Sequence, residues 1–375
     1  MNPILPGATI GILGNGQLGR MTAQAAIRMG YNVACYGPDA TPTPCGQAGA
    51  REVQGAYDDL ASLEAFAKSV DVMTFEFENV STAATAVAEQ HIPVHPAGSV
   101  LHTTQDRIRE KAALVDAGIP VAPYSVITQR DDLGTVNYPG ILKTAQSGYD
   151  GKGQKLVRDV TEAQNAFESF GSVPCVLEAL VPFLWEGSVV GARNAAGETA
   201  LYPLVQNIHT NHILDTTLVP APLATAELHV NAAALAERIL DSLNVIGVMC
   251  IEMFITDSGI IVNELAPRPH NSGHWSIEGA VTSQFEQHVR AVCGLPLGST
   301  ALRAPASAMA NLLGDCWPDP DWVGALADSR VSLHLYGKTD ARIGRKMGHF
   351  TAVASNVNDA VDAVTAARTR LRSSH

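Results

Sequence analysis

Thr9-Ile10-Gly11-Ile12-Leu13, followed at once by Gly14-Asn15-Gly16-Gln17-Leu18-Gly19, decides the fold class of the N-terminal part of this chain. The first five residues are a short apolar run, which predicts a buried strand. Apolar residues then recur at helical spacing through Met21, Ala25 and Met29, and Gly30 can end the helix. The stretch therefore predicts a strand, a glycine-rich turn and a helix.

Further strands are predicted at Tyr31–Tyr36 and Val70–Phe77, with a helix near Leu60–Lys68 between them. Strands alternating with helices predict a doubly wound parallel sheet, and we expect this Rossmann-like α/β domain to span 1–103. Residues 104–300 instead favour antiparallel strand pairs with flanking helices, which is α+β architecture. Residues 301–375 predict a small C-terminal domain.

The composition limits the classes of protein to which this chain can belong. The 375 residues are 46% hydrophobic and 17% charged, which is typical of compact domains. The net charge of −12 disfavours binding to nucleic acid or to anionic membranes. No apolar run approaches the ~20 residues of a membrane span, and no secretory signal is evident. Six scattered cysteines without a CxxC pair indicate buried thiols in the cytoplasm.

The spelling GxGxxG at Gly14–Gly19 leaves three interpretations open. Backbone N–H groups at such a turn can hold the pyrophosphate of a nicotinamide dinucleotide, with Asp39 available for the ribose. They can equally hold another anion, or the turn can be purely structural.

A second glycine-rich segment, Ser147–Gly153, joins two predicted strands, and Lys143 lies on the first of them. Such a loop can cover phosphates with its N–H groups while the lysine supplies a point charge. The alternative is an ordinary hairpin turn.

The predicted hairpin of Val245–Phe254 and Ile260–Leu265 carries the strongest signal for a metal. A three-residue turn at Asp257–Gly259 would place Glu252 directly opposite Glu264, with Cβ atoms about 4.5–5.5 Å apart. Opposed carboxylates are destabilising without a cation, and oxygen ligands alone suit Mg²⁺. A two-residue turn would place Glu252 opposite Asn263 and remove this argument.

Three more segments are candidates for binding a substrate. Glu76 and Glu78 share one face at the carboxyl end of the strand Val70–Phe77, where α/β sheets bind ligands. The loop Pro267–Trp275 and a later cluster are rich in groups that bind anions, although each can also be a solvated surface: Arg268, His270, Asn271 and His274 in the loop; Lys338, Arg342, Arg345 and Lys346 in the cluster.

Several stretches together carry a resemblance that covers nearly the whole chain in order: Gly14–Met21, Phe75–Asn79, Gly148–Gln154, Asn263–Arg268, Asn271–Trp275, Ser283–Glu286 and Gly344–His349. The chain resembles the ATP-grasp ligases and, among them, the 5-(carboxyamino)imidazole ribonucleotide synthase family of purine biosynthesis (the ATPase subunit of phosphoribosylaminoimidazole carboxylase).

The resemblance implies a fold, a reaction and partners. Residues 1–103 would be a pre-ATP-grasp domain, 104–300 an ATP-grasp domain with a nucleotide lid at about 120–185, and 301–375 a domain that completes the substrate site. ATP, with Mg²⁺, would phosphorylate bicarbonate to carboxyphosphate, and the amine of 5-aminoimidazole ribonucleotide would capture the carboxyl group. A cytoplasmic homodimer is expected.

The resemblance also implies roles by matching position. The expected ATP contacts are Arg107, Lys143, the mobile loop Gly148, Tyr149, Asp150, Gly151, Lys152, Gly153 and Gln154, the adenine hinge Glu178, Ala179, Leu180 and Val181, and Glu186, His209, Asn263 and Glu264. The expected catalytic residues are Tyr149, Asp150, Arg268, His270, Lys338 and Arg345. The expected ribonucleotide contacts are Gln17, Glu76, Asn271, Lys338, Arg345 and Lys346, and the Mg²⁺ ligands are Glu252 and Glu264.

Two stretches depart from the family pattern: Ala145-Gln146-Ser147, where relatives carry basic residues and a glycine, and His212, where a glycine is usual. The alternative enzyme is a formate-dependent glycinamide ribonucleotide formyltransferase, which shares the nucleotide site but not the acceptor. An NAD(P)-dependent oxidoreductase built on the first glycine motif, and a catalytically inactive nucleotide sensor, are hypotheses of other classes.

Overall fold

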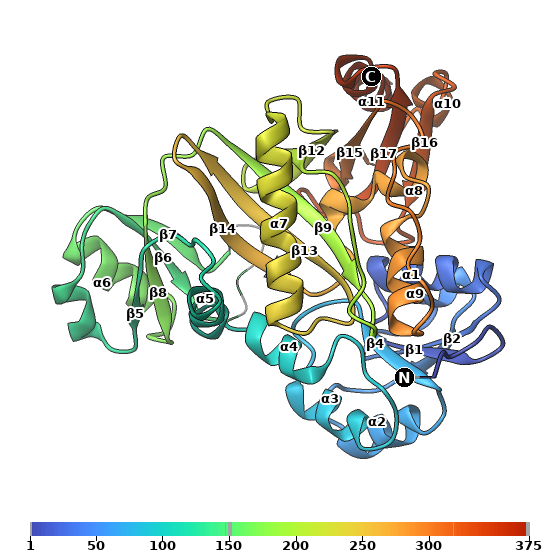
Figure 1. The fold of residues 1–375 in the computed structure, drawn as a ribbon, viewed down its shortest axis with the longest axis horizontal. Helices are drawn as coiled ribbons and strands as arrows, with labels where there is room; N and C mark the ends of the chain where they lie inside the picture. The colour runs from blue at the N-terminus through green and yellow to red at the C-terminus, as the bar shows by residue number, and fades with distance from the viewer. Residues whose placement is uncertain (1, 147, 149–151, 318, 373–375) are drawn as a thin grey trace.

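The computed structural model describes residues 2–146, 148, 152–317 and 319–372. Three sheets organise the chain, and Figure 1 shows them as separate layers with the nine-stranded sheet in the middle. The α/β and α+β fold class predicted from the strand patterns is confirmed.

The N-terminal sheet is parallel, with the order β3-β2-β1-β4. The predicted strand, glycine turn and helix of Thr9–Met29 are present as β1 and α1. Its elements are β1 (Thr9–Leu13), α1 (Gln17–Arg28), β2 (Asn32–Gly37), β3 (Arg51–Gln54), α2 (Leu60–Ala67), β4 (Val72–Phe75), α3 (Thr82–Glu89) and α4 (Gly98–Thr104).

A small antiparallel sheet follows, with the order β5-β8-β6-β7. The predicted hairpin around the second glycine loop is present, because Lys143 on β6 pairs with Gln154 on β7. Helix α5 (Arg107–Asp116) lies beside this sheet (Figure 1). The other elements are β5 (Tyr124–Ile127), β6 (Gly140–Thr144), β7 (Gln154–Val157), α6 (Val160–Ser169) and β8 (Cys175–Ala179).

The nine-stranded sheet has the order β14-β13-β9-β11-β12-β15-β17-β16, and β10 pairs with β9. Strand β12 pairs with β15, so hydrogen bonding continues across residue 300 into the C-terminal segment. The strands are β9 (Trp185–Arg193), β10 (Thr199–Leu201), β11 (Val205–Thr210), β12 (Ile213–Val219), β13 (Gly247–Thr256), β14 (Gly259–Ala266), β15 (Ala306–Leu313), β16 (Val331–Leu335) and β17 (Lys346–Ala354).

Helices cover this sheet and bury its apolar side chains. Helix α7 (Ala226–Ser242) crosses β9 and β13, as Figure 1 shows, and its Ile239 and Leu240 are fully buried. Helix α9 (Gln284–Val292) instead packs against α1, which joins the sheet to the N-terminal layer. The remaining helices are α8 (Ser276–Gly279), α10 (Trp322–Ala325) and α11 (Val357–Leu371).

The hairpin of β13 and β14 differs from its predicted form. Thr256 pairs with Gly259, so the turn has two residues, and the prediction of a three-residue turn is wrong. A bulge then leaves Asn263 without a partner, because Met253 pairs with Val262 while Glu252 pairs with Glu264. The extra residue shifts the register by one. Glu252 and Glu264 are therefore opposite each other, as predicted, but for a different reason.

Two further expectations from composition can be compared with the structure. All six cysteines are free and buried, as their sequence pattern predicted. Within the described part of the chain, no helix has the length and apolar character needed to cross a membrane.

Candidate active site

The glycine turn between β1 and α1 holds an anion that belongs to the protein itself. The N–H groups of Gly16 and Gly19 both donate to the carboxylate of Glu76, and the Gly19 bond is 2.6 Å long. Gly14 has φ +113°, and a Cβ there would lie 2.2 Å from the Glu76 side chain. Since Glu76 occupies the place of a dinucleotide pyrophosphate, the nicotinamide interpretation loses its structural basis.

Glu76 and Glu78 follow β4 and engage different parts of the chain. Burial raises the pKa of Glu76, while the two N–H groups and the cations Arg268 and Lys338 oppose that rise. Glu78 instead forms a two-pronged ion pair with Arg268, with Nε–Oε2 and Nη2–Oε1 distances of 2.6 and 2.8 Å. This pair links the N-terminal sheet to the segment after β14. Sequence reasoning placed Glu76 and Glu78 on one face of a strand, but β4 ends at Phe75, and the ion pair of Glu78 with Arg268 was not predicted.

Helix α5 presents three charged residues on one face, because Arg107, Glu110 and Lys111 are separated by three and four positions. Asp106 caps the helix by accepting from the N–H of Ile108. Arg107 donates to the carbonyl oxygens of Thr144 and Gly148, at 2.9 and 3.3 Å, and lies 3.5 Å from Glu264. One rigid helix therefore brings Arg107 to both the glycine loop and the acidic pair.

Glu110 and Lys111 were missed at the sequence level. Glu110 is buried and accepts from the N–H of Leu265, and its burial, with Glu264 nearby, raises its pKa well above the ordinary value. Lys111 is 1% exposed and lies 3.0 Å from Glu178. The spacing of the charges in Arg107–Lys111 was visible in the sequence, but their burial was not.

Lys143 points from β6 toward the same centre. Its Nζ donates to Glu178 Oε2 at 2.9 Å and to Asn263 Oδ1 at 3.4 Å. Asn263 is the bulge residue of β14, and a bulge redirects the side chain that it carries. Burial raises the pKa of Glu178, but Lys143 and Lys111 outweigh burial and the pKa is lowered.

The predicted hinge residues lie where β8 ends. Glu178 is on the strand, Ala179 is its last residue, and Leu180 and Val181 follow directly, with Leu180 43% exposed. On the nine-stranded sheet, Glu186 on β9 forms an ion pair with His209 on β11. These residues line the side of the site away from the N-terminal sheet.

The pKa values of Glu252 and Glu264, the acidic pair, are shifted in opposite directions. Burial would raise the pKa of Glu252, but His270, whose Nε2 lies 3.0 Å from Glu252 Oε1, lowers it to about 2. Burial and the charge of Glu252 raise the pKa of Glu264 despite Arg107. Two opposed carboxylates with asparagine alongside form a set of hard oxygen donors that fits Mg²⁺.

The donor set is small. Within the described ranges, no group of three or more His, Cys, Asp or Glu residues forms a complete metal cage. Mg²⁺ usually takes one or two carboxylates and completes its coordination with waters and substrate phosphates. The residues present therefore fit a metal that arrives with a nucleotide.

A buried chain of hydrogen bonds orients His270. Its Nδ1 lies 2.9 Å from the hydroxyl of Ser272 and also accepts from the Ser272 N–H. The Ser272 hydroxyl meets that of Ser188 at 2.8 Å, and Asn207 donates to Ser188 at 2.9 Å. Because Nδ1 accepts from Ser272, the Nε2 proton faces Glu252. Ser272 and Ser188 were not among the predicted site residues.

The C-terminal segment reaches the glycine turn through Lys338. Its Nζ donates to Gln17 Oε1 and to the Lys346 carbonyl oxygen, the latter at 2.7 Å. Residues predicted to contact one ligand thus meet from opposite ends of the chain. Arg345 donates to the Asp340 carbonyl oxygen at 2.8 Å. Asn271 is buried and exchanges amide hydrogen bonds with Asn311.

The glycine loop between β6 and β7 is described at both ends. Tyr149, Asp150 and Gly151 lie outside the described residues, as does Ser147. Gln146, at one departure from the family pattern, donates to Asp106 at 2.9 Å and so supports the cap of α5. His212, the other departure, has φ +65°, a left-handed conformation that favours glycine and so accounts for the usual residue.

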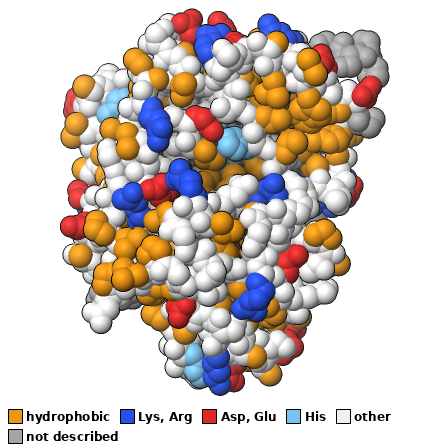
Figure 2. Space-filling model, turned by 90° about the vertical axis from the view of Figure 1, so that its right-hand side faces the viewer, with side chains coloured by type: hydrophobic (Ala, Val, Ile, Leu, Met, Phe, Trp, Pro, Cys, Tyr) orange, Lys and Arg blue, Asp and Glu red, His pale blue; other side chains and the backbone are white. Residues whose placement is uncertain are grey.

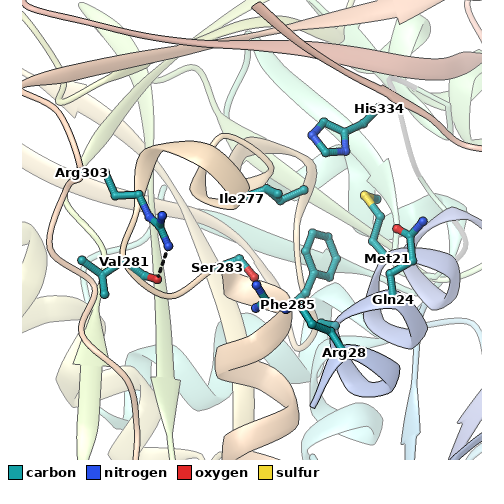
Figure 3. Close-up of a pocket in the computed structure, with 10 residues that line it drawn as sticks. Met21, Gln24, Arg28, Ile277, Val281, Ser283, Phe285, Arg303 and His334 are labelled. Carbon is teal, nitrogen blue, oxygen red and sulfur yellow. Dashed lines mark hydrogen bonds between the residues drawn. The ribbon is translucent and has the colours of Figure 1, made fainter. Parts of the chain in front are cut away.

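An open pocket of about 200 Å³ lies elsewhere, between α1 and the segment of α8 and α9. Figure 3 shows Met21 and Gln24 facing Ile277 and Phe285 across it, with His334 and Arg303 at its ends. None of its ten lining residues is a predicted site residue. The candidate active site is instead the region where α5, the bulged hairpin and the loop after β14 meet.

Comparison with known proteins agrees with this arrangement. The ribonucleotide synthetase preATP-grasp domain matches residues 7–105, the ATP-grasp domain 112–285, and the phosphoribosylaminoimidazole carboxylase C-terminal domain 307–363. The N5-carboxyaminoimidazole ribonucleotide synthase of Bacillus subtilis is 40% identical over 96% of both chains. The chain belongs to the N5-carboxyaminoimidazole ribonucleotide synthase family. It is an ATP-grasp ligase that forms a carbon–nitrogen bond with ATP, as the resemblance implied.

Other relatives give the same result. The Pseudomonas aeruginosa synthase is 44% identical over 91% of this chain and 93% of its own. The structure of the Thermus thermophilus synthetase superposes with a TM-score of 0.89 at 40% identity, covering 98% and 99% of the two chains. An Aspergillus clavatus synthase, solved with ADP and 5-aminoimidazole ribonucleotide, gives 0.88 at 29% identity, covering 97% and 98%.

Proposed function

We propose that this protein carboxylates 5-aminoimidazole ribonucleotide with bicarbonate at the expense of ATP. The observation that carries the proposal is the meeting of a half-buried acidic pair, Glu252 and Glu264, with cations from three separate segments. Arg107, Lys143 and Arg268 all lie around that pair or its neighbours. Anionic substrates and the transferred phosphoryl group need this concentration of positive charge.

The nucleotide would lie between the two antiparallel sheets. The hinge after β8 would receive the adenine, Glu186 and His209 the ribose, and Arg107 and Lys143 the phosphates. Glu252 and Glu264 would hold Mg²⁺, which neutralises charge on the phosphate oxygens when bound. Glu264 is already 3.5 Å from Arg107, so the metal and the cation would act on neighbouring oxygens.

Bicarbonate would bind near Arg268 and His270. Glu78 fixes the plane of the Arg268 guanidinium through two bonds, and Nη1 donates to the Pro269 carbonyl oxygen at 3.2 Å. One N–H group on each of Nη1 and Nη2 is left for a carboxyl or phosphoryl oxygen. Ser272 fixes the ring of His270. Both side chains are thus oriented before a substrate arrives, which lowers the cost of reorganisation during phosphoryl transfer.

The proposed reaction has two steps. In the first, a bicarbonate oxygen takes the γ-phosphoryl group of ATP, which gives carboxyphosphate and ADP. The amine nitrogen then bonds to the carboxyl carbon, the bond from that carbon to the phosphate oxygen breaks, and phosphate leaves. The amine loses one proton, for which Asp150 is the proposed acceptor. The glycine loop of Gly148–Gln154 would close over the intermediate and exclude water.

Gln17, Asn271 and the C-terminal cations would hold the ribonucleotide. Lys338 bridges Gln17 and the start of β17, and a ribonucleotide phosphate near these residues would meet Lys338, Arg345 and Lys346. Glu76, bound inside the glycine turn, would support that turn beneath the ligand. We further propose a cytoplasmic homodimer. The face that Figure 2 displays carries clusters of apolar side chains, and exposed apolar surface of this kind supports association with a second copy.

The test is release of ADP and phosphate with each substrate omitted in turn. Full turnover should require ATP, Mg²⁺, bicarbonate and 5-aminoimidazole ribonucleotide together. Replacing bicarbonate with formate and the ribonucleotide with glycinamide ribonucleotide tests the formyltransferase alternative. Turnover with that pair, or a lack of dependence on bicarbonate, would overturn the proposal. A fluorescence titration with a reduced nicotinamide dinucleotide should show no binding.

A further inference from the structure

Lys111 is a buried cation for which the reaction above has no use. Its side chain is 1% exposed, on the face of α5 that also carries Arg107. Its Nζ lies 3.0 Å from Glu178 Oε1, while the other oxygen of Glu178 accepts from Lys143 at 2.9 Å. Glu178 itself is 4% exposed. One buried carboxylate therefore serves two lysines.

The two lysines have different freedom to move. Lys111 is fixed by its helix and lies 5.8 Å from the centre of the Tyr124 ring, which is beside Glu178 in the β5–β8 pairing. Lys143 is 12% exposed, lies next to the last residue of β6 and also contacts Asn263. Lys143 can leave Glu178 for a ligand, whereas Lys111 has no other carboxylate within ion-pair distance among the residues that the structure describes.

We propose that Lys111 is a positioning residue that keeps Glu178 paired while Lys143 moves from Glu178 to the phosphates of the nucleotide. The inference rests on the proposed function, because it takes Lys143 as a phosphate contact. Its physical basis is that a buried carboxylate left without a partner is strongly unfavourable. With Lys111 present, the departure of Lys143 leaves a complete ion pair behind. Without Lys111, nucleotide binding would strand the charge of Glu178, so Lys143 would stay where it is.

The lowered pKa of Glu178 agrees with two cations acting on one carboxylate. The geometry also favours a change of partner at Glu178. Lys143 donates a hydrogen bond to Glu178 Oε2, whereas Lys111 lies at ion-pair distance from Oε1 without a hydrogen bond of good geometry. After Lys143 leaves, a small rotation of the carboxylate could direct both oxygens to Lys111.

The experiment compares Lys111→Met with the double variant Lys111→Met/Glu178→Gln. The single variant should raise the KM for ATP at least about tenfold, with the KM for the ribonucleotide within about twofold of wild type. Because Glu178 is itself an expected nucleotide contact, Glu178→Gln alone is the reference for the double variant. With no buried charge to strand, adding Lys111→Met to Glu178→Gln should change the KM for ATP by less than about twofold. Lys155→Met, an exposed lysine of β7 in the same small sheet, is the matched control and should change neither constant.

Two results would overturn the inference: a KM for ATP within about twofold of wild type in a folded Lys111→Met protein, or a KM for ATP that rises about tenfold or more when Lys111→Met is added to Glu178→Gln. The second result would mean that Lys111 has only a structural role. If Lys111→Met does not show a cooperative melting transition, the comparison of the double variant with Glu178→Gln decides alone. Removing both charges of a buried pair is often neutral for stability.

A failure of the proposed function is distinguished by a second measurement. The rise in melting temperature caused by ADP with Mg²⁺ is recorded for every variant, because it needs no turnover. If wild type releases no phosphate with the ribonucleotide but is stabilised by ADP, the proposed function fails and the loss and recovery of that stabilisation still test Lys111. The shift should be lost in Lys111→Met, and in the double variant it should equal that of Glu178→Gln.

Discussion

The ion pair of Glu78 and Arg268 gives a prediction whose size follows from the structure. The two residues are 190 positions apart, and their side chains are 26% and 15% exposed. Glu78→Gln keeps one oxygen that can accept from the guanidinium, but it places an amide N–H group against the second N–H. One charge-assisted bond of about 1.5–3 kcal/mol is lost, together with the compensation of a largely buried cation.

We expect Glu78→Gln to lower the free energy of unfolding by about 2–4 kcal/mol. Unfolding entropy scales with chain length, so the melting temperature should fall by about 3–5 °C if the chain unfolds as one unit. The matched control is Asp315→Asn, which removes one partner of the exposed pair with Arg372, at 2.7 Å. Exposed pairs contribute about 0.2–1 kcal/mol, so this variant should melt within about 1 °C of wild type.

The effect has a defined pH dependence. Burial would raise the pKa of Glu78, but Arg268 outweighs burial and lowers the pKa below its ordinary value of 4.5. A carboxyl group with a lowered folded-state pKa contributes its full stability above the unfolded value and loses it as pH falls through the folded value. The difference in the free energy of unfolding between wild type and Glu78→Gln should therefore be constant in buffers from about pH 6 to about pH 8. It should shrink as the pH falls below 4.5.

The assays are thermal melting over pH and steady-state kinetics. Because Arg268 is proposed to contact bicarbonate, the KM for bicarbonate should rise by about tenfold while the KM for ATP changes little. The reasoning is refuted if Glu78→Gln melts no lower than Asp315→Asn. It is also refuted if the stability difference grows as the pH is lowered.

Three further perturbations test other parts of the site. Glu264→Gln should abolish turnover. Its melting temperature without Mg²⁺ should equal or exceed that of wild type, because the change relieves the repulsion from Glu252. Phosphate release at the wild-type rate in ordinary Mg²⁺ would exclude Glu264 as a metal ligand. Lys338→Ala and Arg345→Ala should each weaken use of the ribonucleotide by about 10- to 150-fold and use of ATP far less, which the two Michaelis constants measure. Constants within about twofold of wild type would mark them as surface charges. Gly14→Ala should destabilise the N-terminal sheet by more than about 2 kcal/mol, since φ is +113° and Glu76 fills the space, and unchanged urea unfolding would contradict this.

The sequence by itself determined the local elements. The apolar run and glycine turn of Thr9–Gly19 predicted β1 and α1, because periodicity and turn chemistry act within a few residues. The pairing of Lys143 with Gln154 was predicted for the same reason. Motif spellings along the chain also identified the family, since each stretch is continuous in sequence.

The bulged hairpin shows where local reasoning reached a correct result by a wrong path. A two-residue turn alone would have separated Glu252 from Glu264, and the bulge at Asn263 restores their pairing. A bulge depends on what the extra side chain meets, and Asn263 meets Lys143 from another sheet. Its position could not be predicted from the residues of the hairpin.

Only the tertiary structure decided which charges meet. Glu76 fills the glycine turn from 60 residues away, and Lys338 reaches Gln17 across 321 positions. Such contacts leave no periodic trace, because they join the ends of elements whose own patterns report only helix, strand and burial. Lys111 in particular reads as one more polar residue on a helix. Its burial against Glu178 exists only because α5 packs against β8, and that packing gives a buried lysine its partner.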